Sequence, residues 1–405
     1  MIINYYKKPI MKIHIIGIND RTESFSDEIM HLITSSKNFA GGKRHYSIVS
    51  GILPQKHNWV DILAPLESLF SSITKTREDW VIFASGDPLF FGIGNTLSKK
   101  FPQTQIKIYP AFNALQLLAH RFKLPYGKFT TISLTGRPWH EFDKALITGG
   151  PRMGILTDRN KTPGVIAKRM LEYNYDNYIM YYGEHLGGYN ETVKIMTIEE
   201  AANFEGRHPN CLFIEKTNQY IPQKGISEKD FATLPGRPNM ITKLSIRLTT
   251  VALMNLHNKT TFWDIGACSG SISVEAKLNY PHLNVHAFEI REESNKIMDY
   301  NFRKFQTPGI SKSINNFVHV EKKEMERPDC AFLGGHNNQM ESMLKELDKF
   351  LLPEGVIGFN SVKDESKERF LNWCKNHNFS IIITNRLMPD EHNPVHILIA
   401  QKASN

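Results

Sequence analysis

The residues best suited to chemistry lie between Asp264 and Glu289. Asp264 belongs to a short apolar run, 261–265, which is followed by a turn holding Gly266 and Gly270. Glu289 follows the next apolar run. A carboxylate at that place can accept hydrogen bonds from both hydroxyls of a ribose, and the glycines let the backbone approach a ligand closely. The pattern predicts a nucleoside-binding crevice.

The glycine spacing separates two classes of ligand for this crevice. A dinucleotide-binding turn reads G-x-G-x-x-G, with the pyrophosphate on a helix N-terminus. Here Cys268 stands where the middle glycine would be, and Asp264 precedes the turn. An acid there suits a cationic amino-acid group, so the residues favour S-adenosylmethionine over NAD; an ordinary strand-to-helix turn stays open as an alternative. The cofactor candidates here are Asp264, Gly266, Ala267, Cys268, Ser269, Gly270 and Glu289.

Short apolar runs that alternate with amphipathic stretches must position these residues. Such alternation predicts parallel α/β architecture. Strands are expected at 12–18, 80–85, 106–109, 130–134, 154–157, 178–182, 211–214, 261–265, 283–288, near 317–320, 330–333, 355–359, 379–384 and 395–400. Helices are expected at 25–33, 112–120, from 163, and at 240–255, 294–305 and 340–350.

The chain of 405 residues is long enough for two or three domains. A polar stretch rich in proline and glycine predicts a linker at 219–238, between a first domain at 11–218 and a second at 239–405. The apolar runs are far shorter than a membrane span. Four widely spaced cysteines predict neither disulfides nor a metal site, and we expect a cytoplasmic protein.

The net charge of +8 suits an anionic partner, either nucleic acid or a small molecule with several carboxylates. The basic residues are scattered without a run of five, which argues against a nucleic-acid-binding tail.

The second half resembles the class I methyltransferases that methylate carbon 15 of precorrins and decarboxylate them. The motifs that carry this resemblance are Gly236–Lys243, Arg247, Trp263–Ser271, Glu289, Ala331–Gly335 and Asn360–Val362. The first half resembles the class III tetrapyrrole methylases that methylate carbon 5. Its motifs are Gly41–His45, Gly86–Phe91, Ser133–Arg137, Leu156–Asp158 and Glu184–Gly188. The order of the two halves is that of the bifunctional precorrin-6Y C5,15-methyltransferases (decarboxylating).

The resemblance implies a two-lobed tetrapyrrole methylase domain followed by a Rossmann-like methyltransferase domain. It further implies S-adenosylmethionine as the cofactor of both halves and a reduced tetrapyrrole as the substrate. Additional cofactor contacts are then expected at Gly17, Gly86, Asp87, Leu89 and Thr242. Substrate contacts are expected at Lys43, Arg44, Arg137, Lys243, Arg247, Gly334, Gly335 and Asn360. The basic side chains among them suit the carboxylates of such a macrocycle.

Several questions stay open at the level of sequence. No side chain identifies itself as the catalytic acid or base, and we expect a homo-oligomer that binds neither nucleic acid nor a membrane. One alternative keeps the fold and changes the substrate to RNA or DNA. In another, the first half only binds substrate, because its first turn, Gly17–Asp20, lacks the glycines of related methylases.

Overall fold

The computed structural model describes residues 11–20, 25–76, 78–389, 391 and 393–404. The chain forms two compact units. The first holds the residues up to Arg137 together with 152–167 and 179–215, and the second holds 138–151, 168–178 and everything from Lys216 onward.

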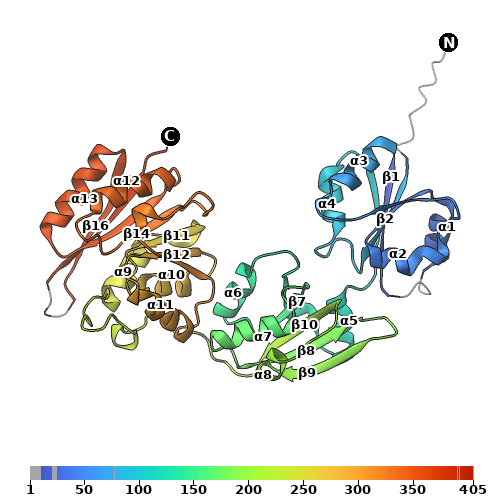
Figure 1. Ribbon diagram of the computed structural model, residues 1–405, viewed down its shortest axis with the longest axis horizontal. Helices are drawn as coiled ribbons and strands as arrows, with labels where there is room; N and C mark the ends of the chain where they lie inside the picture. The colour runs from blue at the N-terminus through green and yellow to red at the C-terminus, as the bar shows by residue number, and fades with distance from the viewer. Residues whose placement is uncertain (1–10, 21–24, 77, 390, 392, 405) are drawn as a thin grey trace, which may run out of the picture. The chain divides into compact units, whose positions relative to one another are not determined.

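The first sheet of the first unit has five parallel strands in the order β3-β2-β4-β1-β5. These strands are β1 (Lys12–Ile18), β2 (Asn38–Gly41), β3 (Asn58–Asp61), β4 (Trp80–Ser85) and β5 (Gln105–Tyr109). One face packs on α1 (Asp27–Ser35) and α2 (Lys43–Val49), and the other on α3 (Glu67–Thr76) and α4 (Ile93–Lys100) (Figure 1). The buried strand β4 is apolar from Trp80 to Ala84, as expected when helices cover both faces of a sheet.

The second sheet has the strand order β6-β7-β10-β8-β9 and is mixed, since β6 pairs with β7 in parallel and the β7–β10 and β8–β9 pairs are antiparallel. Its strands are β6 (Thr130–Ser133), β7 (Arg152–Leu156), β8 (Tyr178–Glu184), β9 (Thr192–Thr197) and β10 (Asn210–Lys216). The neighbouring helices in sequence are α5 (Ala114–Phe122), α6 (His140–Ile147), α7 (Pro163–Glu172) and α8 (Ile198–Ala202). Helix α6 and the end of α7 belong to the second unit.

The second unit contains one seven-stranded sheet in the order β13-β12-β11-β14-β15-β17-β16. The strands are β11 (Thr261–Ile265), β12 (Asn284–Glu289), β13 (Ile310–Ile314), β14 (Cys330–Leu333), β15 (Val356–Ser361), β16 (Phe379–Leu387) and β17 (Val395–Lys402). The first five are parallel, and β17 joins β15 and β16 in antiparallel register. The helices are α9 (Leu244–Leu253), α10 (Ser271–Asn279), α11 (Glu293–Lys304), α12 (Met340–Phe350) and α13 (Asp364–Asn376).

Helices cover both faces of this sheet. Phe262 packs with α9, α10 and α11, whereas its neighbours Trp263 and Ile265 pack with α12 and α13 (Figure 1). Alternate residues of a strand point to opposite faces, so the run 261–265 is buried along its whole length. This packing holds the carboxyl end of β11, where the glycine turn begins, in one place.

The predicted fold class is confirmed, and most predicted strands are present. The strand expected near 317–320 is wrong: the β-strand lies earlier, at β13, and 317–319 form a short 3-10 helix. Strand β13 reads Ile-Ser-Lys-Ser-Ile. Because its three middle side chains are polar or charged, the strand does not appear in the sequence as an apolar run. Strands β2, β3 and β9 and helices α3, α4 and α13 were missed in the same way, because they are short or rich in polar side chains.

The predicted domain boundaries at 218 and 239 remain a prediction. Part of the predicted linker packs onto the second unit: Ile226 and Phe231 are buried in its core. The backbone of Ala232 also exchanges two hydrogen bonds with the Asn301 side chain. We therefore propose that the second domain begins before 239 and includes much of the predicted linker.

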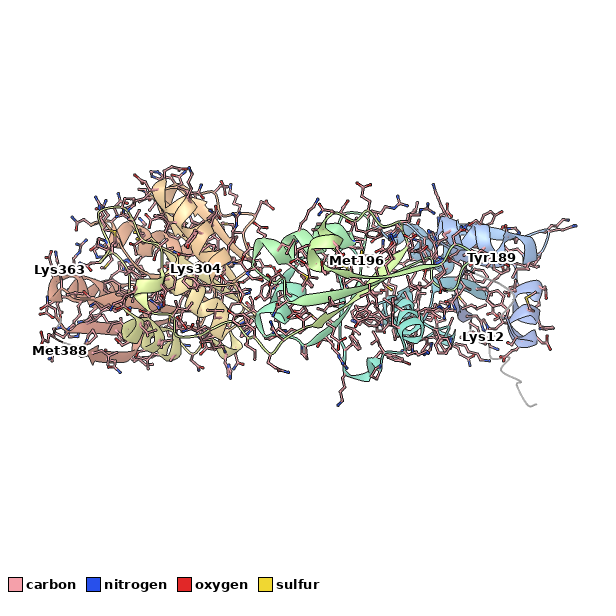
Figure 2. The ribbon with its side chains drawn as sticks, turned by 90° about the horizontal axis from the view of Figure 1, so that it is seen from below. Lys12, Tyr189, Met196, Lys304, Lys363 and Met388 are labelled. Carbon is pink, nitrogen blue, oxygen red and sulfur yellow. The ribbon has the colours of Figure 1, made fainter. Side chains whose placement is uncertain are left out.

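Side chains extend outward along the helices and strands of both units (Figure 2). Within the described ranges, no helix is long and apolar enough to cross a membrane. The same residues contain no group of three or more His, Cys, Asp or Glu side chains placed to hold a metal ion.

Candidate functional site

The second unit has a cleft of about 570 Å³ at the carboxyl ends of β11, β14 and β15. Ligands of open α/β sheets bind at this edge of the sheet. The predicted residues that line it are Thr242, Lys243, Asp264, Gly266, Ala267, Cys268, Ser269, Gly334, Gly335 and Asn360. The fold thus brings together residues that are almost 120 positions apart in the sequence.

Gly266 places two loops of this cleft in backbone contact. Its φ is +77°, a conformation that glycine adopts without strain. A Cβ atom on Gly266 would lie 2.6 Å from the carbonyl oxygen of Gly335 and 2.8 Å from its nitrogen. The turn after β11 therefore packs directly against the turn after β14, with no room for a side chain between them.

Asp264 lies at the base of the cleft and is almost completely buried. Its Oδ2 accepts hydrogen bonds from the backbone nitrogen of Ser273 (3.0 Å) and from its hydroxyl (2.6 Å). Its Oδ1 is buried and has no hydrogen-bond partner among the described residues. Burial raises the pKa of this carboxyl to about 7, against the opposing effect of the Ser273 hydrogen bonds. An unpartnered carboxylate oxygen at a cleft fits a cationic ligand group.

Glu289, at the end of β12, lines a narrow second pocket beside the cleft. Its Oε2 accepts from the backbone nitrogen of Cys268 (2.9 Å). Its Oε1 accepts from the backbone nitrogens of Ile290 and Arg291 and from the Arg291 side chain. A carboxylate offers about four acceptor positions, so Oε2 can still accept one ligand hydroxyl. The predicted contact with both ribose hydroxyls stays a prediction, and the existing hydrogen bonds leave Glu289 one acceptor position for it.

Cys268 occupies a left-handed backbone position, with a φ of 53°. A glycine would adopt this conformation without strain, whereas the cysteine adopts it at some cost in backbone strain. Its thiol contacts the carbonyl oxygen of Met240 at 3.2 Å. Burial raises the pKa of the thiol to about 11, so Cys268 stays protonated and is not a thiolate nucleophile.

Contacts within the protein fix the positions of Gly270 and Asn360. Gly270 caps the start of α10, where an added Cβ would lie 2.6 Å from the Phe302 ring, so it fixes the helix rather than lining the cleft. Asn360, at the end of β15, donates from its amide to the Thr250 hydroxyl (2.9 Å), which fixes its orientation at the cleft wall.

Arg247 requires a correction, because the structure removes it from the substrate-contacting set. Its side chain is completely buried. It pairs with Glu275 (3.3 Å) and donates to the carbonyl oxygens of Thr242 (2.7 Å) and Ile226. The guanidinium therefore connects the segment before α9 to α10 by hydrogen bonds and an ion pair, and it is not available to a ligand.

Arg247→Ala should destabilise the second unit without a specific effect on substrate affinity. The change leaves the buried Glu275 carboxylate without its cationic partner, which costs about 3–5 kcal/mol of unfolding free energy. Urea unfolding of the variant measures this loss, and Ser245→Ala, an exposed change on the same helix, should cost less than about 0.5 kcal/mol. Unchanged stability with weakened substrate binding would restore the original prediction.

His336 is a cleft residue that the sequence prediction did not include. It follows Gly335 and lines both the cleft and the narrow pocket. In the part of the chain that the structure describes, its Nδ1 is buried without a hydrogen-bond partner, and burial lowers the pKa of the ring. A lone histidine in a loop gives no signal in the sequence, since the residues that surround it come from other strands.

The first unit has its own cleft, of about 470 Å³, lined by residues of both of its sheets. Gly17 is buried next to the lining residue Ile18, and an added Cβ on it would lie 1.9 Å from the carbonyl oxygen of Gly86 and 2.8 Å from the nitrogen of Ala111. Gly86 itself lines the cleft and has a φ of +60°. The ends of β1 and β4 and the loop after β5 therefore meet backbone to backbone, as the turns of the second unit do.

Four other predicted residues of the first unit lie near the cleft or on the surface without lining the cleft. Asp87 accepts a hydrogen bond from the backbone nitrogen of Leu89 (2.8 Å), so its side chain stabilises the local turn, and Leu89 is 47% exposed. Lys43 is exposed at the start of α2. Arg137 lies over the ring of Phe91, a cleft residue, at 4.9 Å. Among the described residues, the cleft lining does not include five that the sequence analysis predicted: Gly17, Lys43, Asp87, Leu89 and Arg137.

Arg44 lines the first cleft, as predicted for a residue that contacts substrate. Its guanidinium is already engaged: Nη1 pairs with Asp20, and Nη2 donates to the Ser85 hydroxyl at 2.8 Å. Arg44 therefore organises the cleft wall, and much of its charge is balanced within the protein.

Known families match both parts of the chain. The family model of the tetrapyrrole (corrin/porphyrin) methylases matches residues 42–202, and that of the precorrin methyltransferase domain matches 237–389. A precorrin-6Y C(5,15)-methyltransferase (decarboxylating) from Sinorhizobium sp. is 28% identical over 82% of this chain and 81% of its own.

Single-function relatives match the two parts separately. A cobalt-precorrin-7 C(5)-methyltransferase from Salmonella typhimurium is 29% identical over 155 residues, which are 38% of this chain and 74% of that protein. A probable cobalt-precorrin-6B C(15)-methyltransferase (decarboxylating) from Methanosarcina mazei is 26% identical, covering 40% of this chain and 94% of its own.

Proposed function

We propose that this chain, a homologue of the precorrin-6Y C(5,15)-methyltransferases (decarboxylating), methylates carbons 5 and 15 of a precorrin and removes an acetate carboxyl as carbon dioxide. The first unit would act on carbon 5 and the second on carbon 15. The observation that carries the proposal is the presence of two separate clefts in one chain, each built on a glycine that admits no side chain.

S-adenosylmethionine would supply an electrophilic methyl group in both clefts. The second cleft fits this molecule: Asp264 has an unpartnered oxygen suited to its cationic amino-acid part, and Glu289 has one acceptor position left for a ribose hydroxyl. In the first unit, the backbone of Gly86 and the rings of Phe90 and Phe91 would hold it, and Gly17 lies behind Gly86, where a side chain has no room. Asp87 and Leu89 would contribute through the shape of their loop.

Methyl transfer to carbon is an in-line displacement, which depends on alignment and exclusion of water more than on a strong acid. The residues of each cleft would therefore act mainly by orienting the macrocycle against the methyl donor. Lys243, Gly334, Gly335 and Asn360 would orient it in the second cleft. For the decarboxylation, the conjugated macrocycle itself can accept the electron pair that the lost carboxyl leaves behind.

The affinity of the second cleft for S-adenosylmethionine should rise with pH through neutrality. Below a pKa of about 7, Asp264 is protonated and does not attract a cation; above it the carboxylate does. Below that pKa, the KM for S-adenosylmethionine in carbon-15 methylation should therefore fall about tenfold per pH unit as pH rises. Asp264→Asn should give a higher KM that is flat between pH 6 and 8. A pH-independent KM in the wild type would contradict the role of Asp264.

The proposed function is tested with the full chain, isotope-labelled S-adenosylmethionine and two tetrapyrroles. With a precorrin-6B-type substrate, mass spectrometry should show loss of carbon dioxide and two labelled methyls, because the product of carbon-15 methylation is itself the substrate for methylation at carbon 5. With a precorrin-7-type substrate it should show one methyl and no loss. Running each with and without cobalt decides which form is used. Absence of transfer to both substrates would overturn the proposal.

Two alternatives are decided by simple measurements. A nucleic-acid methyltransferase would bind RNA with a steep salt dependence, whereas we expect weak binding. Amino-base methylating enzymes commonly carry an Asn/Asp-Pro-Pro-aromatic loop where this chain has Gly334 and Gly335.

If the first unit only binds substrate, the precorrin-7-type substrate will bind without being methylated. A cytoplasmic location and a homo-oligomeric state stay predictions.

A further inference from the structure

Ser85 has a hydrogen-bonding position in the first cleft that neither its sequence motif nor the relatives assign. It is the last residue of β4, lines the cleft and is exposed. Its hydroxyl oxygen lies 2.8 Å from Nη2 of Arg44 and 2.9 Å from Nε2 of His45. If both groups donate to the Ser85 oxygen, the hydroxyl can donate its own proton to a ligand. If one of them accepts that proton, the hydroxyl cannot donate to a ligand.

The tautomer of His45 follows from its second contact. The backbone N–H of Gly42 donates to Nδ1 of His45 at 3.1 Å, so Nδ1 carries no proton. Burial, followed by the charge of Arg44, lowers the pKa of the ring to about 4, against the opposing effect of the Phe83 carbonyl. The ring is therefore neutral near pH 7, and its one proton is on Nε2, which faces the Ser85 hydroxyl and also interacts with the Phe83 carbonyl.

Both contacts of the Ser85 oxygen are consequently donors. An arginine guanidinium has no acceptor, and a protonated Nε2 has none either. Together they can occupy the two acceptor positions of the hydroxyl oxygen, and neither can accept its proton. The Ser85 hydroxyl is thus oriented to donate, and the place open to it is the cleft.

The charges around the cleft select the kind of acceptor. Among the described residues that line it, Asp20 is the acidic one, and it is paired with Arg44. The imidazole of His208 also lines the cleft. A carboxylate placed against Ser85 would therefore lie near hydrogen-bond donors. The negative charge of Asp20 would repel it little, because Arg44 neutralises that charge.

We propose that the Ser85 hydroxyl binds a carboxylate in the first cleft, namely an acetate or propionate arm of the tetrapyrrole, with Gly42, Arg44 and His45 holding it in the donating orientation. This assignment rests on the proposed function for the identity of the ligand. S-adenosylmethionine also carries a carboxylate, so the experiment must separate the two sources.

The test compares Ser85→Ala with Ser85→Thr, which keeps the hydroxyl. With a precorrin-7-type substrate, Ser85→Ala should raise the tetrapyrrole KM about ten- to hundredfold, the usual effect of losing a hydrogen bond to a charged group. The kcat and the KM for S-adenosylmethionine should stay within about twofold, since such a bond would be made equally in the ground and transition states. Ser85→Thr should stay close to wild type, and carbon-15 methylation in the same chain serves as the internal control.

Equilibrium binding of the same tetrapyrrole, followed by its absorbance, gives a readout that does not need turnover. Loss of affinity in Ser85→Ala, restored in Ser85→Thr, supports the inference even if the wild type fails to methylate, in which case only the proposed function falls. A raised KM for S-adenosylmethionine alone would move the carboxylate contact to the methyl donor and overturn the assignment to the substrate. Unchanged affinity for both molecules would overturn the inference entirely.

Discussion

Gly17→Ala should abolish methylation at carbon 5 and leave methylation at carbon 15 intact. The added Cβ would lie 1.9 Å from the carbonyl oxygen of Gly86, so the end of β1 and the loop after β4 must move apart. Both belong to the wall of the first cleft. A shift of about 1 Å in an aligned displacement reaction costs on the order of a hundredfold in rate, and we expect at least that loss with a precorrin-7-type substrate.

The matched control for this change is Gly127→Ala. Gly127 lies in a short 3-10 helix of the same unit, and an added Cβ there meets nothing within 4 Å. This control should keep both activities. A Gly17→Ala variant that lost carbon-15 methylation instead would reverse the assignment of the two units to the two carbons. A protease-resistant first unit in Gly17→Ala would show that the loss is local.

The turn after β11 could be predicted from the sequence because its signal is local. An apolar strand, Asp264, two glycines and a carboxylate at the next strand end follow one another within thirty residues, and each has a role that depends on its immediate neighbours. The structure places Asp264 and Gly266 at the cleft as expected, and Glu289 at the adjoining pocket. Burial of the strand from both faces then fixes their positions.

Residues whose role depends on distant partners could not be assigned in the same way. Arg247 lies in a motif beside Lys243, yet its partner is Glu275, which faces it from a different helix. Only the packing of α9 on α10 decides that one basic side chain is buried and the other reaches the cleft. Ser85 and His45 are likewise forty positions apart and meet because β2 and β4 are neighbours in the sheet.

Gly266→Ala should have the reciprocal effect, with carbon-15 methylation and decarboxylation lost and carbon-5 methylation kept. Two costs combine here. Alanine is strained at a φ of +77°, by about 1–2 kcal/mol, and its Cβ would lie 2.6 Å from the carbonyl oxygen of Gly335. Relief of this clash must displace the turn after β14, which forms the opposite wall of the cleft. We expect a loss of at least about a hundredfold in the carbon-15 rate.

Paired with Gly17→Ala, this variant makes the two-cleft arrangement testable in one chain. If each unit carries one reaction, the two variants should give complementary products from the same tetrapyrroles, and an equimolar mixture of the variants should restore both methylations. If Gly266→Ala also stopped methylation at carbon 5, with the first unit still resistant to protease, the two reactions would share one cleft. The glycine turn after β11 would then be the only methyl-donor site, and the cleft beside Gly17 would serve for binding alone.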